Sequence, residues 1–274
     1  IIREIESPKG YVLSEEEIAV TIGKVDEVVE IELVNYFIKG NIALTKVDED
    51  YPDNKLSGAV FEVYSDTNGD GKLDKDDTLL GEMKELDGGV YQMSELRYGK
   101  YLVKETKAPT GFVLDENVYS VSVEENGKTY TVENKAGVGF INAAQKGSLK
   151  IVKTSSDGKV EGFSFRVTGV DYDQTFKTDK NGEIVIEGLR IGDYTVSEVS
   201  DKASAGYILP ADKQATVKVD ATAIVQMHNE FRDTPKTGDD FNLGLWVSLA
   251  ALSVVGAGVL GFVGYKNRKK KKED

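Results

Sequence analysis

Short runs of alternating apolar and polar residues dominate the chain as far as residue 232. Runs such as YSVSVEE, GKTYTVEN, EIVIEGL and ATVKVD are rich in Val, Ile, Tyr and Thr, and turn sequences with Asn-Gly, Asp-Gly or Gly-Gly separate them. An apolar residue at every second position suits a strand with one buried face, because side chains alternate between the two faces of a sheet. The pattern predicts an all-β fold of antiparallel β-sandwiches, with no helix before residue 243.

A different pattern begins at residue 243. Residues 243–264 contain no charged side chain, and at about 1.5 Å per residue a helix of this length crosses a hydrocarbon core of about 30 Å. Six Lys and Arg residues follow within residues 265–274, and such a basic cluster stays on the cytoplasmic side of a membrane. The sequence therefore predicts one C-terminal transmembrane helix, a basic cytoplasmic tail and an exported remainder. A buried core helix, the alternative, fits the basic cluster poorly.

Three landmarks recur along residues 1–232. The first is a Gly followed six residues later by a Lys, at NIALTKVD and SLKIVKTS. The second is a Glu before a Gly-aromatic turn, in REIESPKGYVL, VKETKAPTGFVL and VSEVSDKASAGYIL. The third is an Asn near the end of a short apolar segment, in IELVNYF, VGFINAA and VQMHNEF. The spacing from Glu to Asn is 31, 37 and 31 residues, and Asn precedes the next Lys by 11 residues in both available cases. The landmark residues are Lys46 and Lys153, Glu4, Glu105 and Glu198, and Asn35, Asn142 and Asn229.

The repeat divides the chain into modules. Residues 40–145 and 146–232 are predicted as two complete sandwiches, each long enough to bury a core. Residues 1–39 are predicted as the C-terminal half of a truncated module, with the partial set Glu4 and Asn35. Residues 233–242 then form a linker, residues 243–264 the membrane helix and residues 265–274 the tail. The chain starts at Ile1 without an export signal, so we expect it to be the C-terminal part of a longer protein.

A Lys, a Glu and an Asn from different strands of one core can form an amide crosslink. Burial lowers the pKa of a Lys and raises that of a Glu, which brings both neutral forms within reach near pH 7. A neutral amine can attack the Asn carboxamide while the protonated Glu shuttles protons and ammonia leaves. The alternative is an ordinary edge-strand Lys, surface Glu and turn Asn. The repeated spacing favours crosslinks from Lys46 to Asn142 and from Lys153 to Asn229.

These segments resemble the B-type, prealbumin-like (SpaA-type) repeats of Gram-positive collagen adhesins and pilins. The matching segments are LTKVD, LSGAVFEVY, LRYGKYLVKETKAPTGFVL and FIN, and then LKIVKTSSDGKVEGFSFRVTG, TDKNGEIVIEGLRIGDYTVSEV and VQMHNEF. The resemblance covers residues 1–232 and implies a spontaneous intramolecular isopeptide bond in each module, on Lys46, Glu105 and Asn142 and on Lys153, Glu198 and Asn229. The last module departs from the family's ETKAPxG box, although its Glu is intact.

An acidic loop in the first complete module, DTNGDGKLDKDD, fits a 12-position calcium pattern except that an Asp ends it where a Glu is usual. Hard oxygen ligands at alternate positions suit Ca²⁺, so we expect a structural calcium site. The alternative is a solvated acidic hairpin. The candidate ligands are Asp66, Asn68, Asp70, Lys72, Asp74 and Asp77.

The stretch Thr234-Pro235-Lys236-Thr237-Gly238 resembles the LPXTG sorting signal of Gram-positive wall proteins, with Thr in place of Leu. The resemblance implies a sortase, a cysteine transpeptidase that cleaves after Thr237 and joins its carboxyl group to an amine of peptidoglycan or to a pilin Lys. It places the protein in the cell wall, on the extracellular surface of a Gram-positive bacterium, with a transient membrane-inserted precursor. The alternative is a plain linker before a membrane anchor.

Composition narrows the functions. The chain has no Cys, a single His and a net charge of −13, which argues against disulfides, most enzyme classes and nucleic acid as a partner. His228 is expected as a strand residue near the core. The leading hypothesis is a wall-anchored, crosslinked stalk that presents a missing N-terminal head to a host extracellular-matrix or cell-surface ligand. The alternatives are a pilus subunit joined through a Lys, for which DYPDNK (50–55) is a candidate, and sandwiches that act as adhesins themselves.

Overall fold

The computed structural model describes residues 1–232, which form nineteen strands, β1 to β19. This confirms the predicted all-β fold for that part of the chain. No helix among residues 1–232 is long and apolar enough to cross a membrane. The linker, the stretch 234–238, the predicted membrane helix at 243–264 and the basic tail lie outside the described residues.

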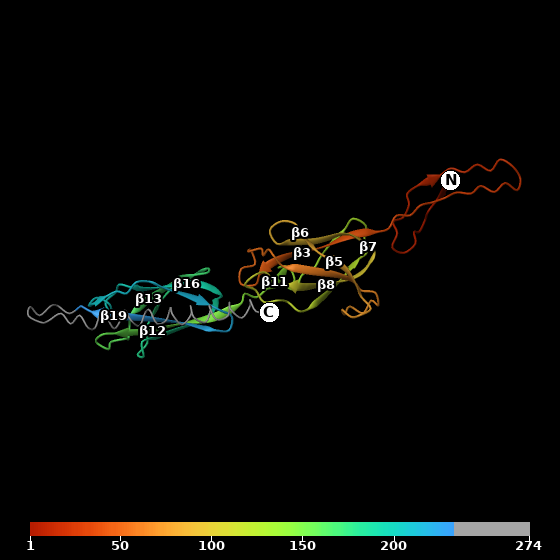
Figure 1. Ribbon diagram of the computed structural model, residues 1–274. Helices are drawn as coiled ribbons and strands as arrows, with labels where there is room; N and C mark the ends of the chain where they lie inside the picture. Colours follow the sequence, from red (N-terminus) through yellow and green to blue (C-terminus); the bar gives the residue numbers. More distant parts are fainter. Residues whose placement is uncertain (233–274) are drawn as a thin grey trace, which may run out of the picture.

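The first sandwich consists of strands β3 to β11, arranged in two facing sheets (Figure 1). One sheet has the order β10-β3-β7-β6, with β11 also paired to β3, and the other has the order β5-β4-β8-β9. The strands are β3 (Lys39–Asp48), β4 (Val60–Ser65), β5 (Thr78–Glu82), β6 (Lys84–Glu85), β7 (Val90–Arg97), β8 (Gly99–Lys107), β9 (Val118–Val123), β10 (Thr129–Thr131) and β11 (Phe140–Asn142).

The second sandwich consists of strands β12 to β19 and repeats this plan. Its sheets have the orders β15-β12-β19-β17 and β14-β13-β16-β18. The strands are β12 (Lys146–Ser155), β13 (Ser164–Gly169), β14 (Tyr172–Lys177), β15 (Glu183–Arg190), β16 (Gly192–Val199), β17 (Tyr207–Ile208), β18 (Lys213–Val217) and β19 (Thr222–Phe231).

Each sandwich buries its own apolar core between its two sheets. Along β3 and β12 every second side chain is buried, which is the alternation that the sequence predicts. The first core contains Ile42, Leu44, Phe61, Val103 and Phe140. The second core contains Leu149, Ile151, Phe165, Val196 and Met227.

The first and last strands of each sandwich are neighbours and run parallel, which corrects the prediction of purely antiparallel sandwiches. Phe140 on β11 lies opposite Lys46 on β3, and Met227 on β19 lies opposite Lys153 on β12. Parallel neighbours need a long connection between them, and here the rest of the sandwich provides it. The two ends of each sandwich's chain therefore lie side by side.

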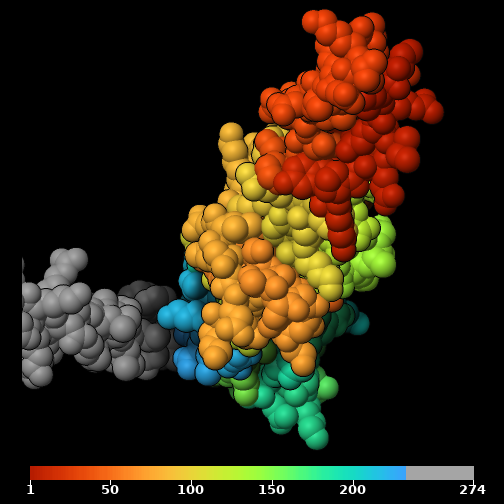
Figure 2. All heavy atoms as spheres, turned by 90° about the vertical axis from the view of Figure 1, so that its right-hand side faces the viewer, coloured from red at the N-terminus to blue at the C-terminus, as the bar shows by residue number. Residues whose placement is uncertain are grey.

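Residues 1–39 form a small unit beyond the first sandwich (Figures 1 and 2). Strands β1 (Ile2–Arg3) and β2 (Glu17–Ile18) pair, and an isolated bridge joins Tyr11 to Phe37. The segment IELVNYF, which the sequence predicts as a strand, has no strand at residues 31–36. Residues 10–12 lie beside the end of this segment, where the Val12 amide donates to the Tyr36 carbonyl at 2.8 Å, whereas β19 lies between the two strands β12 and β17.

Charged side chains join the two sandwiches end to end. The Arg190 guanidinium at the end of β15 donates to both carboxylate oxygens of Asp48 at 2.6 and 2.8 Å and to Asp50 at 3.0 Å. Lys146 forms an ion pair with Asp50 at 3.1 Å. Because Asp48 is the last residue of β3, this contact links the Lys-bearing strand of one sandwich to the next sandwich.

Candidate functional site

The first sandwich brings Lys46, Glu105 and Asn142 together in its core. They lie on β3, β8 and β11, and all three are buried. Because Phe140 lies opposite Lys46 in the parallel pair and side chains repeat every two residues, Asn142 faces the same side of the sheet as Lys46. Strand β8, in the facing sheet, supplies Glu105.

The Glu105 carboxylate lies between the two nitrogens of the cluster. Its Oε2 accepts a hydrogen bond from Asn142 Nδ2 at 2.8 Å, and its Oε1 is 3.9 Å from Lys46 Nζ. Asn142 Nδ2 also donates to the Val113 carbonyl at 2.5 Å, and Lys46 Nζ donates to the Phe140 carbonyl at 3.0 Å. One carboxyl group thus approaches both the amine and the carboxamide nitrogen.

Two oxygens of this cluster are buried without a hydrogen-bond partner among the described residues, Glu105 Oε1 and Asn142 Oδ1. Leaving such a group unsatisfied costs about 1 to 3 kcal/mol, so native cores usually avoid it. The free oxygen of Glu105 is the one that faces Lys46 Nζ. Glu105 Oε1 can therefore still accept a hydrogen bond or a proton on the side of the Lys46 amine.

Burial shifts both titratable groups of this cluster towards their neutral forms. It lowers the pKa of Lys46 from 10.5 to about 8, against the opposing effect of the carboxylates of Glu105, Asp115 and Asp48. Burial also raises the pKa of Glu105, although a backbone hydrogen bond from Asp115 and the Asn142 carboxamide oppose the rise. A neutral amine and a neutral acid are the forms that amide formation needs.

The second sandwich places Lys153, Glu198 and Asn229 in the same way, on β12, β16 and β19. None of the three is more than 9% exposed. Asn229 Nδ2 donates to Glu198 Oε1 at 2.6 Å, while Glu198 Oε2 and Asn229 Oδ1 lack partners in the described part of the chain. Burial lowers the pKa of Lys153 and raises that of Glu198.

The lysine amines of the two sandwiches differ in their contacts. Lys153 Nζ donates to the Thr154 carbonyl at 2.6 Å, whereas Lys46 Nζ lies close enough to Glu105 for an ion pair. Both amines lie over the face of a phenylalanine ring, Lys153 over Phe163 at 4.5 Å and Lys46 over Phe140 at 5.0 Å. The aromatic rings exclude water on that side and still attract a cation.

Glu4 and Asn35 also meet, in residues 1–39. Asn35 Nδ2 lies 2.9 and 2.7 Å from the two oxygens of the Glu4 carboxylate, and both residues are partly buried. No ion pair joins Glu4 to a lysine within residues 1–232. The structure therefore brings together two members of a set of which residues 1–39 lack the third.

The acidic loop at residues 66–77 folds around its own backbone. The Asp66 carboxylate accepts the amides of Gly69 and Gly71 at 2.7 and 3.2 Å, and Asp77 accepts the amide of Thr67 at 3.1 Å. No three acidic, His or Cys side chains gather as a metal site anywhere in residues 1–232. Calcium binding by this loop stays a prediction.

His228 lies on β19, but its side chain is exposed, so the prediction of a position near the core is wrong. Its ring nitrogens contact Thr154 Oγ1 at 2.8 Å and Glu230 Oε1 at 3.2 Å. The next residue, Asn229, takes the inward position, and neighbouring side chains on a strand point to opposite faces.

Several contacts of the cluster could not be found from residue types. The amide of Asp115, ten residues after Glu105, donates to the Glu105 carboxylate at 2.8 Å. The Val113 and Phe140 carbonyls bind the carboxamide and the amine. All three contacts come from the backbone, so almost any residue type at these positions would permit them; only a proline in place of Asp115 would remove the amide that donates to Glu105.

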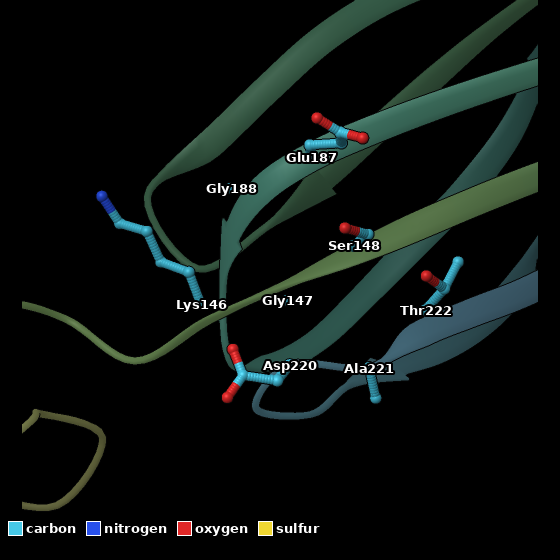
Figure 3. A pocket seen from close by; sticks show the side chains of 8 residues that line it. All are labelled: Lys146, Gly147, Ser148, Glu187, Gly188, Asp220, Ala221 and Thr222. Carbon is cyan, nitrogen blue, oxygen red and sulfur yellow. The ribbon is translucent and has the colours of Figure 1, made fainter.

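One hollow of the surface lies at the second sandwich but away from its buried cluster. A hollow of about 380 Å³ lies at the start of β12, and Figure 3 shows its side chains spread around that strand. Lys153, Glu198 and Asn229 do not line it. Its lining residues are Lys146, Gly147, Ser148, Glu187, Gly188, Asp220, Ala221 and Thr222.

Known proteins share this fold. The family model of the SpaA prealbumin-like fold domain matches residues 40–136 and 147–231. The Bacillus anthracis TIE protein, whose structure is known, is 26% identical in sequence to this chain, and the two structures match with a TM-score of 0.63. The match covers 84% of this chain and 41% of the TIE chain, so this chain spans about two fifths of the length of that protein. No curated protein matches the sequence.

Two pilin structures are also similar. A minor pilin of Streptococcus agalactiae is 17% identical, with a TM-score of 0.33 over 73% of this chain and 100% of its own. The shaft pilin SpaA of Lactobacillus rhamnosus GG is 14% identical, with a TM-score of 0.33 over 72% of this chain and 99% of its own.

Proposed function

Because the chain belongs to the family of SpaA prealbumin-like domains, we propose that it is a pilin-like surface protein whose sandwiches are the crosslinked modules of a stalk. The proposed modules are residues 40–145 and 146–232. The observation that carries the proposal is the buried Lys, Glu and Asn cluster, which occurs at the same place in both sandwiches.

The proposed reaction joins Lys46 to Asn142 without an external catalyst. The neutral Nζ of Lys46 attacks Cγ of Asn142, and a new C–N bond forms. Glu105 takes a proton from the attacking amine through Oε1 and delivers one to the departing Nδ2 through Oε2, so that the old C–N bond breaks and ammonia leaves. The distances from these two oxygens to the two nitrogens support this role.

Folding lowers the activation barrier of this reaction. The core holds amine and carboxamide side by side, and such proximity can lower a barrier by about 7 to 11 kcal/mol. The bond then closes a long loop, which in the chain-entropy model stabilises the fold by roughly 4 to 5 kcal/mol. Unlike a disulfide, the amide is not reducible, which suits a chain without cysteine.

We further propose that Thr237 is the attachment point. A sortase would cleave between Thr237 and Gly238 and join the threonine carboxyl to a peptidoglycan amine, leaving the protein on the extracellular surface of a Gram-positive cell. The sequence order of motif, apolar stretch and basic tail supports this proposal. A host ligand would bind through a region N-terminal to the stalk.

A pilus subunit is the second candidate, because a sortase can also join Thr237 to a lysine of another subunit. Lys55, in the stretch 50–55, is exposed. A pilus subunit would give a ladder of polymers on a denaturing gel of wall extracts, and replacing Lys55 by Arg would remove it. A single anchored species would support the stalk.

Intact mass spectrometry of the purified chain tests the crosslinks directly. We expect the chain to weigh less than its sequence by two ammonia molecules, one for each bond. Glu105→Ala should restore one ammonia and Glu198→Ala the other. An unshifted mass in the folded wild-type chain would refute the crosslink proposal.

A further inference from the structure

The last strand of the first sandwich is interrupted close to its buried asparagine. In the second sandwich β19 pairs with β12 at eight successive positions. In the first sandwich Thr131 on β10 lies opposite Ala43 on β3, and the next paired residue, Phe140 on β11, lies opposite Lys46. Residues 132–139 therefore take the place of two residues of an unbroken strand. These six additional residues account for the Glu-to-Asn spacing of 37 residues in the first sandwich against 31 in the second.

Asn134 lies in this interruption and binds the backbone of β11 with its side chain. Its Oδ1 accepts the amide of Ile141 at 2.6 Å, and its Nδ2 donates to the Ile141 carbonyl at 2.8 Å. A residue of a neighbouring antiparallel strand supplies the same pair of hydrogen bonds. Because β11 consists of only three residues, Phe140–Asn142, this carboxamide is a substantial part of what holds the strand in place.

The same carboxamide connects β11 to the segment that holds Glu105. Asn134 Nδ2 also donates to Asp115 Oδ2 at 2.8 Å, and the amide of Asp115 donates to Glu105 Oε2 at 2.8 Å. Asn142, at the end of β11, donates to that same carboxylate oxygen. The contacts of Asn134 therefore fix the strand that carries Asn142 against the acid that binds its carboxamide.

The second sandwich has neither part of this connection. Strand β19 runs unbroken over Thr222–Phe231, so it has no inserted residue at the place of Asn134. Counted from the Gly-aromatic turn, Pro210 holds the position of Asp115, and a proline has no amide to donate to a glutamate. The second sandwich is therefore a control, within the same chain, for any role of Asn134.

We propose that Asn134 is a positioning residue for the first crosslink, which holds Asn142 within reach of the Lys46 amine. The inference rests on the crosslinking proposed above and adds no chemical step to it. The hydrogen bonds of the Asn134 side chain go to Ile141 and Asp115, so it acts through them and not on the reacting atoms. Positioning matters because a displacement of about 1 Å can slow a reaction by about a hundredfold.

Asn134→Leu tests the proposal, because it removes all three hydrogen bonds at nearly the same side-chain volume. The 274-residue chain is made by cell-free synthesis and sampled over time by intact mass spectrometry, and peptide mapping assigns each ammonia loss to its sandwich. We expect the first crosslink to form at least tenfold more slowly than in the wild type and the second at an unchanged rate. Asn54→Leu, at an exposed position of the same sandwich, is the matched control and should change neither rate.

A second measurement separates positioning from a general loss of stability. Glu105→Gln blocks or greatly slows the first bond, so adding Asn134→Leu to that variant gives, by denaturant unfolding, the stability cost of the substitution alone. This cost fixes the unfolded fraction of the chain, and a purely structural residue would slow the crosslink only by that fraction. A first crosslink that slows no more than this overturns the proposal.

An exchange of the two side chains tests the contact between Asn134 and Asp115. Asn134→Asp alone places two carboxylates together and should slow the first crosslink, whereas Asn134→Asp combined with Asp115→Asn restores a donor and an acceptor and should recover part of the lost rate. Absence of recovery in the folded double variant contradicts the proposal. A wild-type chain that loses no ammonia refutes the crosslinks themselves, so the two failures are distinguishable.

Discussion

Glu105 and Glu198 differ from the other perturbed carboxylates of the chain in the direction of their pKa shifts. Burial raises the pKa of both, whereas hydrogen bonds lower the pKa of Asp115 and bring that of Asp157 to about 2. A carboxyl group with a raised pKa keeps its proton to a higher pH than an ordinary one, and in that form it can donate a proton as well as accept one. This difference is the basis for assigning these two residues the proton transfer.

Replacing Glu105 by Gln should therefore prevent or greatly slow the first crosslink while leaving the core volume almost unchanged. We expect the mass to rise by one ammonia and the first sandwich to lose roughly 4 to 5 kcal/mol of unfolding free energy, the value for a loop of this length. Calorimetry and intact mass measure the two effects. Glu116→Gln, at an exposed position nearby, is the matched control and should change neither.

The lowered pKa of Lys46 predicts a pH dependence in a chain that cannot form the bond. In Asn142→Ala the amine stays free, and its folded pKa of about 8 lies below the ordinary value of 10.5. Between these values the unfolded chain binds more protons, so stability should rise as the pH increases through that window. In the crosslinked wild type this nitrogen is an amide and does not titrate.

Denaturant unfolding of both chains from pH 7 to 10.5 measures this effect. The wild type should remain the more stable chain, and the difference between the two unfolding free energies should narrow as the pH rises, because only the variant gains stability from its free Lys46 amine. Tyrosine ionisation affects both chains equally and cancels in this difference. A constant difference across this range would contradict a free, buried Lys46 amine in the variant.

The sequence was sufficient to predict which residues meet in the core but not how they are held. Recurrent spacing singles out Lys46, Glu105 and Asn142 because a repeated fold needs the same side chains at the same places. The amide of Asp115 and the carbonyl of Val113 leave no trace in residue type. The outward position of His228 follows only once Asn229 is known to face the core.

At the scale of strands, a glycine is the second residue of each lysine-bearing strand, because a neighbouring backbone lies too close for a side chain. A Cβ at Gly147 would be 2.1 Å from the Lys218 carbonyl oxygen and 2.9 Å from that of Ala221. At Gly40 it would be 2.8 Å from the Lys128 carbonyl oxygen. The glycine six residues before each lysine is thus explained by the close approach of two chain segments at one end of the strand.

Gly147→Ala should consequently destabilise the second sandwich by about 1 to 3 kcal/mol, the usual cost of forcing extra volume into a packed site. Thermal unfolding of the variant should show a lower midpoint for that sandwich. Gly23→Ala is the control, since an added Cβ there would meet only the Glu27 carboxylate at 3.5 Å. Equal midpoints for Gly147→Ala and the wild type would show that the loop at Lys218 moves away freely.

The alternation of apolar and polar residues predicted the strands and their buried faces. It could not predict which strands pair with each other in the sheets. Period-two patterning of β3 and β12 states which side chains face the core, but a parallel and an antiparallel neighbour satisfy it equally. The parallel pairing of β12 with β19 depends on the path of the whole chain. The segment IELVNYF failed as a predicted strand for a related reason, because strand formation requires a partner as well as a pattern.

At the scale of the whole molecule, the contact of Arg190 with Asp48 fixes how one sandwich follows the other. The guanidinium donates hydrogen bonds to both oxygens of the buried Asp48 carboxylate and lies over the Tyr51 ring, 4.8 Å from its centre. This ion pair lowers the pKa of Asp48 and keeps it charged. Figure 1 shows the two sandwiches in line. The contact joins the last residue of β3 to the last residue of β15.

Arg190→Gln should loosen this boundary without affecting either crosslink. Small-angle scattering should show a broader distribution of end-to-end distances, and calorimetry a loss of up to about 3 kcal/mol for breaking a largely buried pair. Arg166→Gln, which removes an exposed pair with Asp173, should cost less than about 1 kcal/mol. Unchanged scattering in Arg190→Gln would mean that the short connection between β11 and β12 suffices to align the sandwiches.

The side-by-side ends of each sandwich have a further consequence once Lys46 and Asn142 are bonded. The bond closes residues 46–142, which include the acidic loop at residues 66–77, into a covalent ring. The covalent path from one end of the chain to the other then crosses the Lys46–Asn142 bond and no longer depends on the residues between them. A protease that cuts that loop would open the ring without separating the two ends of the chain. A chain crosslinked in this way would therefore stay in one piece after cleavage of an exposed loop.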